Sequence, residues 1–132
     1  MNFDDIRQLS EDELNRHLEE VAGRRWTLET FPVTGGRLFR YISADGGETY
    51  STVPHLHVSA SWDACMALAN EAHITRRNEP IVHGDPDSAR IWLYHCWAPD
   101  WMDGRCITVP ESVDAQEQRI AIARLYLWWK SF

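Results

Sequence analysis

Three stretches of the chain repeat apolar residues at the three- to four-residue spacing of an amphipathic helix. The first follows Ser10, which forms a capping box with Glu13 three residues later. The second begins after Ser61 or two residues earlier, and we expect it to run to the arginine- and proline-containing segment 76–80. The third follows Asp114, again with a glutamate three residues on. The pattern therefore predicts three helices.

Strand-like segments lie between the predicted helices. Residues 37–43 and 48–53 are rich in aromatic and β-branched side chains, and the turn residues 45–47 separate them. Residues 90–97 carry apolar groups at both odd and even positions, which is typical of a central strand covered on both faces. Residues 105–109 follow a Pro- and Gly-containing turn and form its expected partner. The pattern therefore predicts two hairpins.

The predicted order is helix, hairpin, helix, hairpin, helix. We expect a small α+β fold, an α/β/α sandwich in which a mostly antiparallel sheet made of two hairpins has helices on both faces. A length of 132 residues fits one domain spanning residues 1–132. The last predicted helix is apolar around much of its circumference, so other layers or a second subunit should cover it.

The net charge of the chain narrows the classes of molecule that it is expected to bind. Twenty acidic residues against thirteen basic ones give a formal charge of -7, which disfavours nucleic acid because the basic residues do not gather in one run. No apolar stretch has the length of a membrane span. The three cysteines Cys65, Cys96 and Cys106 form no C-x-x-C pair, and the polar first ten residues do not resemble a secretion signal. We expect a cytoplasmic protein with free thiols.

Candidate chemistry is sparse. His55 and His57 would lie on one face of an extended segment, and His83 and Asp85 are further donors in a loop. These four are the weak candidates for a metal site, but their spacing matches none of the usual zinc motifs. No nucleophile motif, phosphate-binding loop or catalytic acid pair stands out. We therefore expect no cofactor and no catalytic residue, and catalysis stays the less favoured alternative.

Tryptophan is the most unusual residue of the composition, with seven in the chain. Large aromatic side chains serve as anchors at protein interfaces, and aspartates beside them add a charged rim. Several aromatics crowd the last third of the chain, where the C-terminal ones would dock onto the body of the domain or onto a second chain. The interaction candidates are Trp97, Asp100, Trp101, Asp103, Trp128, Trp129 and Phe132.

The segment 59–65, Ser-Ala-Ser-Trp-Asp-Ala-Cys, resembles the opening of a helix in small bacteriophage proteins of the ABA-sandwich domain family and the related NinX-like proteins. The hairpin at 90–109 and the Ala- and Leu-rich helix at 116–129, with its stretch 119–124, are similar to the elements that follow in that family. The resemblance implies an α/β/α sandwich and a phage or prophage origin. It supplies no catalytic residues.

Three functions remain open from the sequence. The first is a small acidic phage accessory protein that acts by binding a host or phage protein, for example by inhibiting a host defence factor. The second is an enzyme or ligand-binding module that uses the histidine and aspartate cluster with a metal ion. The third is a structural homo-oligomer assembled through the C-terminal helix.

Overall fold

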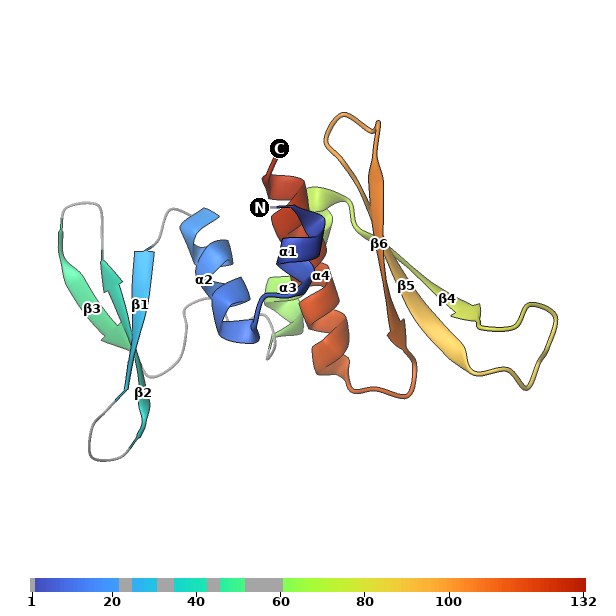
Figure 1. Cartoon of the computed structure of the whole chain (residues 1–132), viewed down its shortest axis with the longest axis horizontal. Helices are drawn as coiled ribbons and strands as arrows, with labels where there is room; N and C mark the ends of the chain where they lie inside the picture. The colour runs from blue at the N-terminus through green and yellow to red at the C-terminus, as the bar shows by residue number, and fades with distance from the viewer. Residues whose placement is uncertain (1, 22–24, 31–34, 43–45, 52–60) are drawn as a thin grey trace. The chain divides into compact units, whose positions relative to one another are not determined.

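The computed structural model divides into two compact units, and the expectation of one domain over residues 1–132 stays a prediction. The terminal unit combines Met1–Gln8 with Val58–Phe132, and the inserted unit is Leu9–His57. Both units contain helices and antiparallel strands, which confirms the α+β class (Figure 1). The structure describes residues 2–21, 25–30, 35–42, 46–51 and 61–132.

The inserted unit begins with the helix that the capping box predicts. Helix α2 spans Glu11–Val21. The Ser10 hydroxyl oxygen accepts the Glu13 N–H at 3.3 Å, and the same hydroxyl lies 3.1 Å from the Glu13 carboxylate. These contacts satisfy an N–H group that the first helical turn leaves without a partner, so the helix begins where the sequence indicates.

Three antiparallel strands complete the inserted unit. Strands β2 (Arg37–Ile42) and β3 (Glu48–Ser51) confirm the first predicted hairpin. Strand β1 (Arg25–Thr30) pairs with β2 on its other edge and was not predicted. On β2, Phe39 and Tyr41 form a buried cluster, since alternate residues of a strand share one face.

The terminal unit is built on a second three-stranded antiparallel sheet. Strands β4 (Thr75–Pro80), β5 (Arg90–Trp97) and β6 (Gly104–Pro110) lie in that order, so β5 is central as its apolar pattern predicts. Helices α1 (Phe3–Arg7), α3 (Trp62–Ala72) and α4 (Ala115–Lys130) complete the unit. Helix α4 packs on β5 and β6, and both α1 and α3 pack on α4.

The second predicted helix ends earlier than the sequence suggests. Helix α3 starts after Ser61, whose side chain accepts the Ala64 N–H at 3.2 Å, and it closes at Ala72 with His73 in a left-handed conformation. The segment 76–80 was wrongly taken as the end of the helix, because it belongs to β4. Pairing with β5 places Pro80 at the strand terminus, where a missing N–H costs no internal ladder bond.

The two faces of β5 are covered differently. Its covered face carries Trp92, Tyr94 and Cys96, of which the last two are buried. Its open face carries Ile91, Leu93, His95 and Trp97, which are half-buried or exposed.

In the described part of the terminal unit, the helices all lie on one side of the sheet (Figure 1). Within the described residues of this unit, the helices therefore form one layer on the sheet. Among the residues that the structure describes, no helix is long and apolar enough to cross a membrane.

Candidate interaction site

The predicted interaction residues fall at two places in the terminal unit. Trp97, Asp100, Trp101 and Asp103 lie at the turn between β5 and β6, whereas the three C-terminal aromatics lie at the end of α4. Trp101 is 60% exposed and Trp97 is 44% exposed. The turn thus presents large aromatic surface to solvent.

We call residues 98–103 the aromatic turn. Its backbone closes through the Ala98 N–H donating to the Asp103 carbonyl and the Trp101 N–H donating to the Ala98 carbonyl, both at 2.8 Å. The Asp100 carboxylate accepts the Met102 N–H at 3.0 Å. Short polar side chains that bond to a backbone N–H two residues later are typical of tight turns. The aromatic turn is therefore held in one shape before any partner arrives.

Trp101 adopts a backbone conformation that is unusual for its residue type. Its φ is 62°, in the left-handed region where a bulky side chain is strained. Such strain persists only where surrounding contacts enforce it, and it concentrates at functional positions. The His73 ring lies 6.1 Å from the Trp101 ring and supports it from the end of α3.

Met102 is the residue at this site that the sequence analysis missed. It is 85% exposed and directly follows Trp101, so the turn offers two adjacent apolar side chains. A methionine at the tip of a Pro- and Gly-flanked turn is the signal that could have revealed it. Met adapts to irregular apolar surfaces because its side chain is unbranched and polarizable.

Arg105 connects the turn to the helical layer. Its guanidinium donates to the Asp103 carboxylate at 2.6 Å and lies over the Trp128 ring at 5.2 Å and the Phe3 ring at 5.8 Å. This hydrogen bond is the largest of the effects that lower the pKa of Asp103. Asp103 therefore carries a negative charge beside Trp101 while anchoring the base of the turn.

The C-terminal aromatics are not equivalent. Trp128 is 4% exposed and packs edge-on against Phe3 at 6.1 Å and Phe132 at 5.1 Å, so its ring belongs to the interior. Trp129 is half-buried, and its ring lies 6.1 Å from that of Tyr126. Phe132 is 66% exposed. At this end of α4, Phe132 offers the most exposed aromatic ring.

The proposed metal donors are not gathered by the described structure. His83 and Asp85 are exposed in the loop between β4 and β5, where the Asp85 carboxylate accepts the Asp87 N–H at 2.9 Å. His55 and His57 lie outside the described residues. In the ranges that are described, no three His, Cys, Asp or Glu side chains come together in a way that could hold a metal ion.

The cysteines separate by environment. Cys65 and Cys96 are buried, and burial raises the pKa of each thiol to about 11. Cys106 is exposed and pairs in register with His95 on the open face, whereas Cys96 lies on the covered face. Cys96 and Cys106 therefore point to opposite sides of the sheet.

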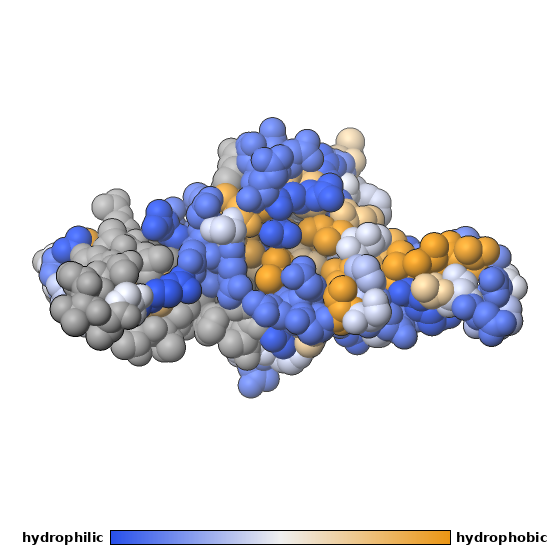
Figure 2. All heavy atoms as spheres, turned by 60° about the horizontal axis from the view of Figure 1, so that its bottom comes forward, coloured by the Kyte–Doolittle hydropathy of each residue, from blue (hydrophilic) through white to orange (hydrophobic). Residues whose placement is uncertain are grey.

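The β4–β5 loop carries a second set of exposed apolar residues. Ile81 is 59% exposed and Val82 is 55% exposed. Figure 2 shows apolar atoms gathered along this hairpin, at the right of the view. The left-handed position of this loop is Gly84, which adopts it without steric cost, so the loop lacks the strained aromatic that marks the turn at the other end of β5.

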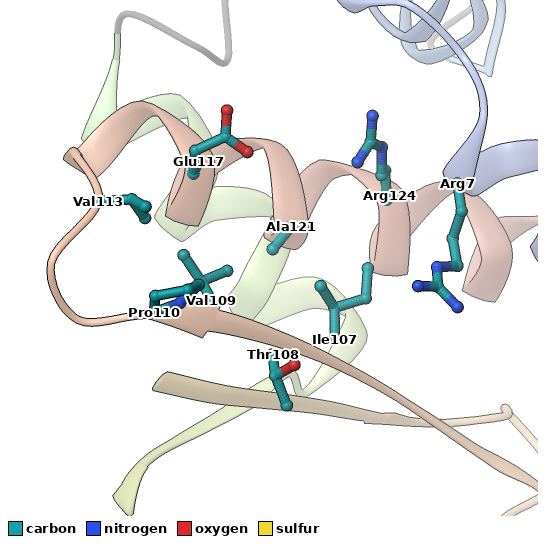
Figure 3. A pocket seen from close by; sticks show the side chains of 9 residues that line it. All are labelled: Arg7, Ile107, Thr108, Val109, Pro110, Val113, Glu117, Ala121 and Arg124. Carbon is teal, nitrogen blue, oxygen red and sulfur yellow. The ribbon is translucent and has the colours of Figure 1, made fainter. Parts of the chain in front are cut away.

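A groove of about 370 Å³ lies between α4 and β6. Figure 3 shows Glu117 and Arg124 on α4, Arg7 on α1 and an apolar floor that includes Ile107 and Ala121. Burial lowers the pKa of Arg124, the Glu117 carboxylate acts in the opposite direction, and Arg7 lowers it further. Charges of both signs thus border this groove, and it selects no single ligand charge.

Comparison with known proteins gives no assignment. No protein-family model, curated protein or solved structure matches this chain. The resemblance to the phage ABA-sandwich family therefore stays a prediction.

Proposed function

We propose that the chain is a binding protein whose aromatic turn docks into another protein. The observation that carries this proposal is Trp101, which is 60% exposed and held at a strained φ of 62° by hydrogen bonds within the turn. Tryptophan is enriched among the residues that dominate binding energy at interfaces. A turn fixed before binding loses little conformational freedom on docking, which favours affinity.

The chemistry of the turn defines the partner surface. Trp101 and Met102 require an apolar pocket, and the exposed carboxylates Asp100 and Asp103 favour basic side chains around that pocket. The formal charge of -7 on the chain would also accelerate its encounter with a basic surface. The partner is accordingly a protein with an apolar pocket and a basic rim. A host defence factor as that partner stays a finer prediction.

Affinity capture with matched variants tests this function. Immobilised wild-type protein and Trp101→Ser would be compared on bacterial lysates, with Val82→Ser as the control because Val82 is also exposed and lies in the other loop of the sheet. We expect a protein that wild type and Val82→Ser retain and Trp101→Ser loses. For the purified partner, the Trp101→Ser affinity should fall by about 2 kcal/mol or more, roughly 30-fold.

Two outcomes would contradict the proposal. One is that wild type retains no protein that Trp101→Ser loses. The other is that Val82→Ser weakens the same interaction as much as Trp101→Ser. Thermal unfolding of both variants provides the folding control, since exposed positions away from the core should change stability by about 0.5 kcal/mol or less.

A further inference from the structure

A second, more apolar groove lies on the other side of α4, within the terminal unit. It has a volume of about 340 Å³, and we call it the α3 groove. Pockets for small ligands begin at roughly this size, are mostly apolar and contain a few polar groups. Its lining includes Trp62, Met66, Ile74, Arg76, Tyr94 and Ile122.

The mouth of the α3 groove exposes large apolar side chains from the first two turns of α3. Trp62 is 36% exposed and Met66 is 47% exposed. They are four residues apart, so they lie on the same face of the helix. Burying this surface under a ligand would remove apolar area from water, and methionine sulfur makes favourable contacts with aromatic rings.

The charge in the groove has one sign. Of the described residues that line it, Arg76 is the one with a charged side chain. The Arg76 guanidinium lies 4.3 Å from the centre of the Trp92 ring, which holds it beside the groove. Arg119 adds a second positive charge at the mouth, with its guanidinium 5.3 Å from the centre of the Trp62 ring. The groove therefore favours an anion although the whole chain is acidic.

A buried phenol completes the polar part of the groove. Tyr94 is 2% exposed, and its hydroxyl donates to the Gln118 side-chain oxygen at 2.5 Å. Burial raises the pKa of Tyr94, and the neighbouring Arg76 acts in the opposite direction. The phenol therefore stays neutral near pH 7 and adds no negative charge beside Arg76.

We propose that the α3 groove binds an organic monocarboxylate with an aromatic body, whose ring packs on Trp62 and Met66 and whose carboxylate pairs with Arg76. The planar guanidinium matches a carboxylate through two parallel hydrogen bonds. A multiply charged anion is disfavoured by the net charge of -7 and by the apolar lining. Such a carboxylate exists both as a free acid and as the C-terminus of a peptide that ends in phenylalanine.

Titration of the full chain with 3-phenylpropionate, followed by calorimetry and by NMR of the tryptophan side chains, tests the inference. We expect saturable binding that shifts the Trp62 indole signal and binding at least tenfold weaker for the neutral 3-phenylpropanamide. A short peptide ending in phenylalanine is a second arm. Tighter binding of the peptide assigns the carboxylate to a protein C-terminus, and tighter binding of 3-phenylpropionate assigns it to a free acid.

Variants separate the carboxylate contact from general charge effects. Arg76→Gln should weaken 3-phenylpropionate at least tenfold, whereas Arg77→Gln should change it by less than twofold. Arg77 is the next residue on β4, points to the opposite face and lies 3.5 Å from the Glu79 carboxylate. Met66→Gln should also weaken the binding of 3-phenylpropionate, although it leaves the Arg76 charge in place. Ile81→Gln, at another exposed apolar residue, is its control.

Four results would overturn the inference. They are the absence of saturable binding of both carboxylates, equal binding of the acid and the amide, equal losses for Arg76→Gln and Arg77→Gln, and displacement of the acid by inorganic phosphate at similar concentration. Circular dichroism of each variant confirms folding. Because the α3 groove and the aromatic turn use different residues, failure of this inference leaves the proposed protein-binding function standing, and the reverse also holds.

Discussion

Both faces of β5 carry apolar side chains, but the two faces have different surroundings. On the covered face, Tyr94 donates a hydrogen bond to Gln118 of α4, and the Cys96 sulfur lies 3.7 Å from the carbonyl oxygen of Ala72 in α3. On the open face, the His95 ring contacts its own sheet, with its centre 4.7 Å from that of Trp97. One face is fixed by the helices of the unit, and the other by neighbours on the same strands.

This contrast shows what an apolar strand does and does not imply. Apolar residues at both odd and even positions predict that a strand is central, and β5 is central. The same pattern does not show that the chain itself supplies a layer for each face. The open-face residues Ile91 and Leu93 remain half-buried within the described structure, although their side chains would suit a core.

The largest contrast is expected from truncating one residue on each face. Tyr94→Ala should reduce the free energy of unfolding by about 3–5 kcal/mol, because it removes a buried ring and leaves Gln118 without its donor. Leu93→Ala on the open face should cost roughly 1–2 kcal/mol, since the side chain is only half-buried. Urea unfolding of both variants measures the difference. Equal losses would show that the two faces are covered alike.

A substitution at Gly104 sharpens the comparison on the open face. A Cβ atom there would lie 2.8 Å from Nε2 of His95, and Trp97 limits the movement of that ring. Gly104→Ala should therefore cost about 1–3 kcal/mol through overpacking. In the background of His95→Ala, the same change should cost much less. A double-mutant cycle in urea measures the coupling, and independent effects would rule out this close approach.

Alkaline pH provides a third test, on the buried thiols. Burial raises the pKa of Cys65 and Cys96 from 9.0 to about 11, so the folded protein keeps both thiols protonated where the unfolded chain ionises them. Their contribution to stability is complete below pH 9 and is lost as the pH rises toward 11. The urea midpoint should fall over this window, less steeply in Cys96→Ala. An unchanged slope in Cys96→Ala would exclude a role for its thiol.

Local signals in the sequence predicted much of the fold. The polar residues Ser10, Ser61 and Asp114 precede helices because their side chains bond to the first N–H groups of each helix. Strand β5 has the bounds that its aromatic and β-branched residues predict. Strand β4 could not be predicted in this way, because Arg76 and Arg77 resemble the charged end of a helix and acquire strand structure only by pairing with β5.

Which aromatic side chains are exposed at the candidate sites depends more strongly on contacts between distant residues than the positions of helices and strands do. The exposure of Trp101 follows from its position in a tight turn, and the sequence places Trp101 among the interaction candidates. The burial of Trp128 depends on Phe3, which is 125 positions away in the chain, and no local pattern reveals this contact. Trp62 and Met66 lie close in sequence to the buried Cys65 and Ala69 of the same helix, but they are more exposed, and the helical spacing alone does not distinguish them.

The contact between α1 and α4 has a consequence for the order in which the chain acquires structure. The terminal unit is discontinuous in sequence, so its closure requires a long-range encounter. During synthesis on a ribosome, α1 is made before α4 and can pack on it only after α4 has emerged. The inserted unit is one continuous segment and can pair its strands earlier. Nascent chains halted before residue 115 would therefore keep the Phe3 and Ile6 side chains available to chaperones.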